Sequence, residues 1–145
     1  MRYGPRVATI VNPDTLAPPR GYSNGMILGG QRVLFVAGQI GWDVEMKMAE
    51  GLTAQFGQAL DNIVDVLREA GGGPEHIGRM TVYVVDKHEY MAEAKAIGLE
   101  YRKRMGKHYP AMSLVQVAAL LEDGARVEVE CTAVLPDAPS DGDAR

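Results

Sequence analysis

The side chains that most often carry chemistry in proteins are few and scattered in this sequence. His76, His88 and His108 stand alone, and no Cys or His lies at a metal-ligand spacing from them. Isolated histidines are typical of surface or capping positions, so we expect no metal site. The single cysteine, Cys131, falls on the apolar side of an alternating segment, where a thiol acts as a small hydrophobic side chain.

Glycine-rich motifs for phosphate binding are also missing from the sequence. It contains no Gly-x-x-x-x-Gly-Lys loop and no Gly-x-Gly-x-x-Gly motif after a predicted strand. The glycines at 71–73 follow a helical pattern and indicate its end. The candidates for a ligand site are therefore the segments 20–25, 36–41, 109–113 and 127–130. In the last segment, Glu128 and Glu130 taken alone are typical of solvated strand positions.

Apolar periodicity predicts the elements that must position these segments. One apolar stripe predicts a helix over residues 53–70. Asp86 followed by Glu89 indicates a capping box that opens a second helix ending near residue 105. Strands are expected at residues 7–11, 25–28, 33–37, 80–85, 113–117 and 126–135, with the glycines at 29 and 30 closing a hairpin between the second and third.

This order of elements predicts an α+β fold, a six-stranded mixed sheet with two helices on one face. The other face mixes polar and apolar residues, and we expect another subunit to cover it. One domain is expected over residues 1–135. Residues 136–145 lack apolar side chains that would pack, and are expected to form a disordered tail.

Composition narrows the classes of function. The chain has 145 residues, 46% of them hydrophobic and 23% charged, which is typical of a globular domain. Its net charge of −4 argues against a nucleic-acid partner, because a phosphate-binding surface is basic. No apolar run approaches the length of a membrane span, and one unpaired cysteine suits a reducing compartment. We therefore expect a cytoplasmic protein with no membrane partner.

Five stretches together carry a family resemblance. They are residues 36–41 (Val-Ala-Gly-Gln-Ile-Gly), 55–63 (Gln-Phe-Gly-Gln-Ala-Leu-Asp-Asn-Ile), 81–84 (Thr-Val-Tyr-Val), the Pro110-Ala111 pair and 127–130 (Val-Glu-Val-Glu). From about residue 7 to residue 135 the chain resembles the Rid/YjgF family, the reactive-intermediate deaminases also called L-PSP endoribonuclease-like proteins. The resemblance implies a chorismate-mutase-like homotrimer that binds small-molecule ligands in clefts between subunits. It also implies hydrolysis of an enamine or imine to a carbonyl compound and ammonia, without metal or organic cofactor.

The resemblance also assigns residues to the site. Glu128 matches the glutamate that holds the attacking water, since a carboxylate on a strand can orient water and move a proton. Tyr22 matches an aromatic residue that flanks the ligand, and Tyr90 matches another near the cleft. Gly38 matches a glycine that contacts the ligand through its backbone. Ala111 belongs to the matching Pro-Ala pair and is expected to line the pocket.

Two positions depart from the family pattern. Ala37 stands where the family has serine, so a hydroxyl contact is lost. Met112 stands where the deaminating members carry an arginine that grips the substrate carboxylate. A charge-assisted hydrogen bond contributes about 1.5–3 kcal/mol, so binding of a 2-imino acid is expected to weaken roughly tenfold to a hundredfold. Arg104, Lys107 and His108 are the cations close to Met112 in sequence.

These departures leave three functions open. The first is a deaminase with an altered substrate preference, acting on a less acidic or larger enamine or imine such as an amino-muconate-type intermediate of aromatic catabolism. In that case Met112 forms part of the pocket wall. The second is a non-catalytic trimer that binds a small metabolite. The third, an endoribonuclease, follows only from a family name and conflicts with the acidic charge balance.

Overall fold

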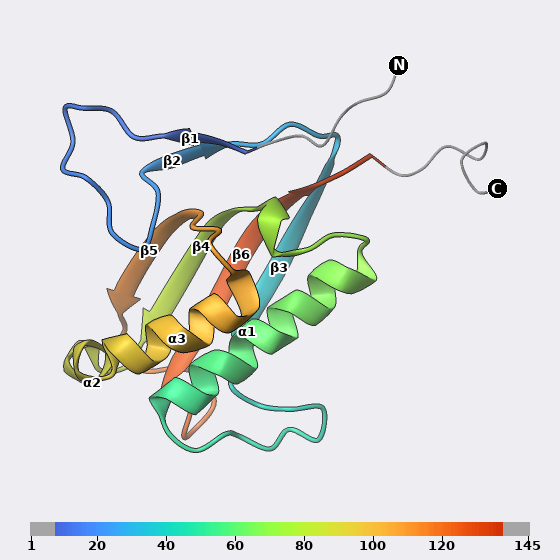
Figure 1. Cartoon of the computed structure of the whole chain (residues 1–145). Helices are drawn as coiled ribbons and strands as arrows, with labels where there is room; N and C mark the ends of the chain where they lie inside the picture. The colour runs from blue at the N-terminus through green and yellow to red at the C-terminus, as the bar shows by residue number, and fades with distance from the viewer. Residues whose placement is uncertain (1–7, 138–145) are drawn as a thin grey trace.

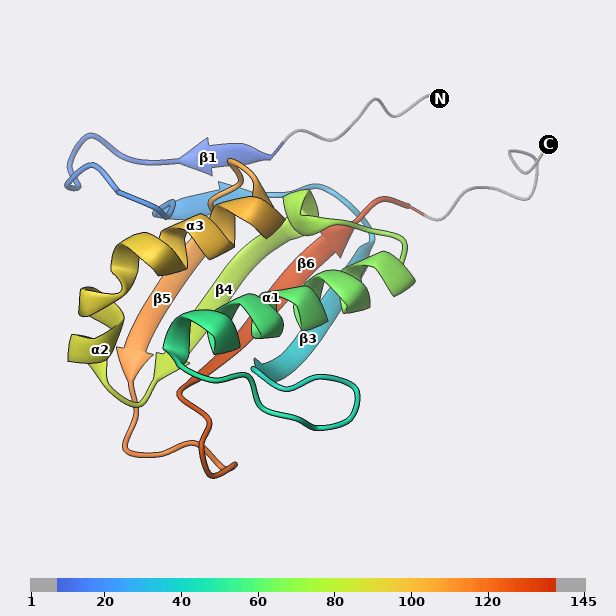
Figure 2. The same ribbon diagram turned by 60° about the horizontal axis from the view of Figure 1, so that its bottom comes forward.

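The computed structural model describes residues 8–137. Three helices and a short 3-10 helix cover one face of a four-stranded sheet, and a two-stranded sheet lies beside it (Figures 1 and 2). The elements are β1 (Thr9–Val11), β2 (Gly25–Ile27), β3 (Arg32–Ile40), α1 (Leu52–Glu69), the 3-10 helix η1 (Pro74–His76), β4 (Ile77–Val84), α2 (Lys87–Ala92), α3 (Ala94–Met105), β5 (Ala111–Gln116) and β6 (Val127–Leu135). This architecture confirms the predicted α+β class.

The larger sheet has the strand order β3-β6-β4-β5. β4 and β5 are parallel, and the other neighbouring pairs are antiparallel. A parallel pair requires a crossover, which α2 and α3 provide between β4 and β5. β6 alternates between buried and half-buried residues along its whole length, so the predicted alternation is confirmed.

The alternation on β6 distinguishes the two faces of this sheet. Val127, Val129, Cys131, Ala133 and Leu135 are buried on the side that the helices cover. We call the opposite side the helix-free face; on β6 it carries Glu128, Glu130, Thr132 and Val134, which are half-buried. Their β3 partners Phe35 and Val33, opposite Thr132 and Val134, are exposed.

The predicted single six-stranded sheet is wrong, because the six strands form two sheets. β2 pairs with β1 rather than with β3, so the predicted hairpin around Gly29 and Gly30 does not form. Gly30 serves a close approach to β6 instead: a Cβ there would lie 2.7 Å from Val134 Cγ1 and 2.8 Å from the carbonyl oxygen of Leu135. The segment between β2 and β3 therefore packs against the end of β6 instead of closing a hairpin between paired strands.

The first helix matches its prediction closely. α1 ends in a Schellman arrangement, in which Gly71 N–H donates to Arg68 O (3.0 Å) and Gly72 N–H donates to Leu67 O (2.8 Å). Gly71 has φ 85°, a left-handed conformation that favours glycine. The predicted stop signal at residues 71–73 is confirmed.

The second predicted helix is divided in two. Asp86 caps α2 as expected, since its carboxylate accepts hydrogen bonds from His88 N–H (2.9 Å) and Glu89 N–H (3.2 Å). Glu93 then leaves helical geometry, with φ −100° and ψ 7°, and separates α2 from α3. Its carboxylate accepts a hydrogen bond from Thr53 Oγ1 (2.6 Å), which ties this break to the start of α1. The single helix over 86–105 is therefore wrong.

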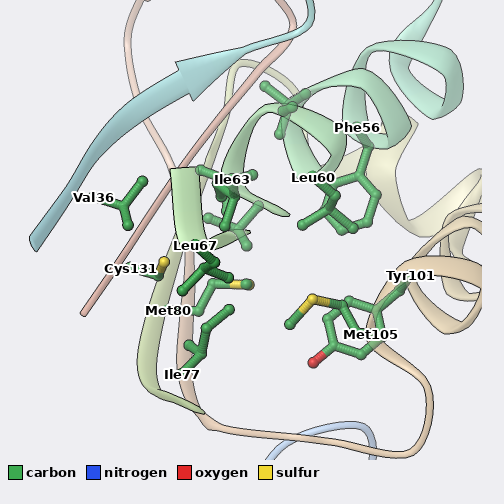
Figure 3. Close-up of a cluster of buried hydrophobic side chains, with 14 of the residues drawn as sticks. Val36, Phe56, Leu60, Ile63, Leu67, Ile77, Met80, Tyr101, Met105 and Cys131 are labelled. Atoms are coloured by element: carbon green, nitrogen blue, oxygen red, sulfur yellow. The ribbon is translucent and has the colours of Figure 1, made fainter. Parts of the chain in front are cut away.

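The hydrophobic core lies between the helices and the larger sheet. Leu60, Ile63 and Leu67 of α1 point toward Met80 and Cys131 on the strands (Figure 3). Tyr101 stacks on Tyr109 at a ring distance of 5.6 Å. No helix within residues 8–137 is long and apolar enough to cross a membrane.

The predicted tail falls partly on described residues. Pro136 O accepts a hydrogen bond from Arg32 Nε (2.9 Å), and Asp137 Oδ1 accepts one from Gln31 N–H (3.3 Å). Residues 138–145 of that prediction, and residues 1–7 of the predicted domain, lie outside the described residues.

Candidate functional site

Glu128 lies on the helix-free face, at the second position of β6. Its Cα pairs with Ile40 on β3 and with Tyr83 on β4, so strands flank it on both sides. The Glu128 side chain extends over Gly38: a Cβ added at Gly38 would overlap Oε1 and lie 2.8 Å from the carboxyl carbon. The structure therefore brings Glu128 and Gly38 of the predicted site into direct contact.

A β-bulge in β3 makes this contact possible. Val36 pairs with Cys131 and Gln39 pairs with Val129, so Ala37 and Gly38 together oppose Glu130. The extra residue bends the strand and exposes Ala37 and Gly38 at its surface. Only glycine leaves room for the carboxylate to lie against the strand, and the backbone of the bulge remains open to a ligand.

A second carboxylate is held beside the first. Tyr83 Oη donates a 2.6 Å hydrogen bond to Glu130 Oε1, and Tyr83 stands directly opposite Glu128 across the β4–β6 ladder. This hydrogen bond is the main cause of a raised pKa for Tyr83, so the phenol stays protonated and keeps donating. The sequence analysis missed Tyr83; its signal was the outward position it holds in the Thr-Val-Tyr-Val strand.

The helix-free face has a hollow next to these carboxylates. Its volume is about 270 Å³, and it is lined by Phe35, Val36, Arg79, Thr81, Glu130, Cys131 and Thr132. Arg79 is exposed there and pairs through its Cα with Thr132 and with Ala111. The face thus combines carboxylates, one guanidinium and the large apolar ring of Phe35.

Tyr22, Ala111 and Met112 form a separate group at the β5 edge of the sheet. Ser23 makes an isolated parallel bridge with Ala111, and its N–H donates to Pro110 O (3.1 Å). The hydroxyl of Ser23 donates to Tyr109 O (2.6 Å), which fixes the loop that carries Tyr22. The side chain of Tyr22 is 39% exposed.

Met112 and Tyr90 belong to the covered side of the sheet. The Cα of Met112 pairs with Met80, whose side chain is fully buried beneath the helices, and Met112 packs against the core. Tyr90 on α2 also packs against the core, and burial raises the pKa of its phenol. The structure does not bring either residue to Glu128 within one chain.

Sheet geometry shows how far apart the two groups are. β4 lies between β6 and β5, so Glu128 and Met112 are separated by two strand spacings of roughly 4.8 Å each. Tyr83, the partner of Glu128, pairs with Val115, three residues along β5 from Met112, which adds roughly 10 Å at about 3.3 Å per residue. A small ligand cannot contact both groups of a single chain.

Two of the three cations near Met112 in sequence, Arg104 and His108, bond to other groups. Arg104 donates through Nε to Asp61 Oδ1 and through Nη1 to Glu100 Oε2, both at 2.6 Å. His108 Nε2 lies 2.7 Å from the carbonyl oxygen of Ile77. Lys107 is exposed. Within residues 8–137, no three His, Cys, Asp or Glu side chains gather closely enough to hold a metal ion.

Comparison with known proteins places this geometry in a family. Residues 12–135 match the family described as endoribonuclease L-PSP. A RutC family protein from Synechocystis is 37% identical over 123 residues, which span 83% of this chain and 90% of the relative. The human protein named 2-iminobutanoate/2-iminopropanoate deaminase is 27% identical over 130 residues, 88% of either chain.

Solved structures give the same result. A Rid family protein of unknown function from Yersinia pestis superposes with a TM-score of 0.79 at 32% identity, covering 89% of this chain and 99% of that one. RidA from a Psychrobacter species superposes with a TM-score of 0.63 at 29% identity, covering 82% and 92%.

The fold and these comparisons therefore define a Rid-type α+β domain. The chain belongs to the endoribonuclease L-PSP family, whose members are also called Rid, RutC or YjgF proteins. This family includes proteins named 2-iminobutanoate/2-iminopropanoate deaminase.

Proposed function

We propose that this chain hydrolyses an enamine or imine to a carbonyl compound and ammonia, in clefts between the subunits of a homotrimer. The observation that carries the proposal is the Glu128 carboxylate, which lies half-buried on the open backbone of Gly38. Relatives named as imine deaminases support the same chemistry at 27–29% identity. The proposal needs no metal or organic cofactor.

The chemistry requires one carboxylate and one water. An imine protonated on nitrogen is electrophilic at carbon, and Glu128 accepts a proton as the water oxygen bonds to that carbon. The resulting carbinolamine takes this proton on nitrogen and expels ammonia as the carbonyl group forms, and Glu128 accepts the hydroxyl proton that this step releases. Water supplies the oxygen, and no electron is transferred to or from the protein.

The cleft in this proposal is made by two copies of the chain. Glu128 and Gly38 of one copy supply the water-binding side, and the β5 edge of the next copy, with Tyr22, Ala111 and the half-buried Met112, supplies the opposite wall. The separation of these two groups within one chain favours this arrangement, and so does the exposure of Phe35 on the helix-free face. Tyr90 and Ala37 complete the predicted set of ligand contacts.

Met112 sets the substrate preference in this proposal. A thioether packs against apolar atoms but offers a substrate carboxylate no positive charge. We therefore expect a less acidic or larger imine to be preferred over small 2-imino acids.

The test is ammonia release from freshly generated enamines, both small acidic ones and larger neutral ones. Wild-type protein should accelerate release from at least one, and Glu128→Gln should reduce that rate at least a hundredfold. Glu75→Gln is a matched control, because Glu75 is an exposed carboxylate on η1. Equal rates for wild type and Glu128→Gln, or no rate above buffer with any substrate, would exclude the deaminase.

A second candidate is a non-catalytic trimer that binds a small metabolite, and the neutral Met112 is the observation that favours it. Met112→Arg separates the two. A gain of 2-aminoacrylate deamination shows that the site is complete except for a cationic side chain that binds the substrate carboxylate. Ligand binding by the wild type, with no turnover in either protein, favours the binding function.

A further inference from the structure

Gln55 is a buried polar residue on the apolar side of α1. Its side chain is only 3% exposed, and its amide group makes three hydrogen bonds to backbone atoms. Nε2 donates to the carbonyl oxygens of Ala49 (3.1 Å) and Gly124 (3.0 Å), and Oε1 accepts from Arg126 N–H (2.7 Å). One side chain thus ties together two segments that lie far apart in the sequence.

Those two segments lead to the two halves of the Glu128–Gly38 contact. Gly124 and Arg126 directly precede β6, and Arg126 is two residues before Glu128. Ala49 N–H donates to Gly41 O (2.8 Å), and Gly41 directly follows β3 at the end that carries the bulge. A Cβ at Gly41 would overlap the Cα of Gln55, so α1 lies against the chain at this point.

We infer that Gln55 is a positioning residue, whose amide holds the start of β6 against the end of β3 and so sets where the Glu128 carboxylate lies on Gly38. This inference rests on the proposed role of Glu128. The long connection before β6 has exposed residues such as Leu121, and backbone bonds to β4 and its end hold only its two ends: Val117 N–H donates to Val84 O (2.8 Å), and Val85 N–H donates to Arg126 O (3.2 Å). Arg126 is also anchored by its ion pair with Glu89, on the α2 side.

The experiment compares Gln55→Glu with Gln31→Glu. The first variant keeps an acceptor for Arg126 N–H but sets carboxylate oxygens against the carbonyl oxygens of Ala49 and Gly124. Gln31 is exposed just before β3, at the end of the strand away from the bulge, so the same Gln-to-Glu change there is a control remote from Gly38 and Glu128. Both variants are assayed as folded protein, verified by circular dichroism, with an imine that the wild type hydrolyses.

We expect Gln55→Glu to lower kcat at least tenfold with KM within twofold, and Gln31→Glu to leave both within twofold. Adding Gln55→Glu to Glu128→Gln should lower the residual rate no further, because the effect acts through Glu128. A purely structural role would lower the rate in both backgrounds. Hydrolysis that requires Glu128 but tolerates Gln55→Glu overturns this inference alone, whereas absence of wild-type hydrolysis overturns it together with the proposed function.

A second measurement needs no variant. Arg126 N–H should exchange with solvent at least a hundredfold more slowly than the amide of Glu122 in the preceding loop, because it is bonded to a buried acceptor. If the two amides exchange at equal rates in the wild type, the hydrogen bond from Arg126 N–H to Gln55 does not hold the start of β6. The inference then fails even when Gln55→Glu does not fold.

Discussion

The two faces of the four-stranded sheet differ in how far they bury large apolar side chains. Beneath the helices, Leu60, Ile63 and Val129 are fully buried. On the helix-free face, Phe35 and Val33 of β3 are 77% and 51% exposed. Successive residues of the same strands point to one face and then to the other. The difference in burial therefore comes from what covers each face rather than from strand propensity. The covered face stabilises the chain, and the helix-free face carries the carboxylates and remains available to a partner.

The two faces also differ in their polar groups. On the helix side, Gln55, Asn62 and Arg104 bond to backbone carbonyls or carboxylates around α1. Within residues 8–137 no buried side-chain nitrogen or oxygen lacks a partner. On the helix-free face, Arg79 forms no ion pair with another described residue, and the bulge at Gly38 leaves backbone open. Polar groups without a side-chain ion pair among the described residues are therefore found on this face, which is the face that the proposed cleft uses.

The largest effect is expected from a cavity on the covered face. Leu60→Ala should lower the free energy of unfolding by about 3 kcal/mol, because the buried site cannot fully collapse. Val33→Ala on the helix-free face is the matched truncation, and we expect it to cost less than about 1 kcal/mol. Urea unfolding of both variants measures the two costs, and equal losses would contradict the comparison.

Self-association provides the next test. Phe35→Glu should weaken association of the chain by about 2 kcal/mol, roughly thirtyfold, because it sets a charge where an interface needs an apolar ring. Sedimentation across a concentration series measures this, with Phe35→Leu as the conservative control. A wild type that stays monomeric at all concentrations would show that no second copy covers this face.

The Arg104 cluster tests the polar contacts of the covered side. Arg104 links Asp61 on α1 to Glu100 on α3, and its side chain is 20% exposed. Arg104→Met should cost about 1 kcal/mol of unfolding free energy, less in high salt. Lys103→Met is the control, because its exposed ion pair with Glu100 should contribute little. Equal costs for the two variants would contradict a specific role for Arg104.

The smallest effect concerns the pH dependence of stability. Burial raises the pKa of the Cys131 thiol to about 12 from an ordinary value of 9.0. The unfolded chain therefore ionises first as pH rises, so this contribution is complete below about pH 9 and declines above it. At pH 10 the loss should be about 1 kcal/mol relative to pH 8. Cys131→Ala should lack this slope; an identical pH profile would show that the thiol is accessible in the folded chain.

Strong local periodicity explains which predictions from the sequence succeeded. The alternation of β6 and the stop of α1 at Gly71 depend on neighbouring residues, and both are confirmed. The division of the second helix falls at Glu93, which bonds to Thr53, forty positions away in the chain, so its partner is not a neighbouring residue. The pairing of β2 with β1 likewise joins strands that the long loop between Val11 and Gly25 separates, and no local pattern encodes it.

The site was predictable only in part, for a similar reason. Glu128 and Gly38 meet because β3 and β6 are neighbours, which a family resemblance implies but periodicity does not. Gln55 stands out in the sequence pattern, because it is polar but lies between Leu52 and Ala59 on the buried stripe of α1. A polar residue at such a position needs buried partners, and its partners are the ends of two strands.

Gly38 also determines how easily this protein loses its chemistry. The groups that a new Cβ would meet there belong to the movable end of the Glu128 side chain, and Gly38 has no left-handed backbone that an alanine would strain. A single added methyl group would therefore displace the carboxylate and leave the fold intact. Activity in this architecture can disappear in one mutational step without unfolding, so a sequence that keeps every strand and helix is no guarantee of a working enzyme.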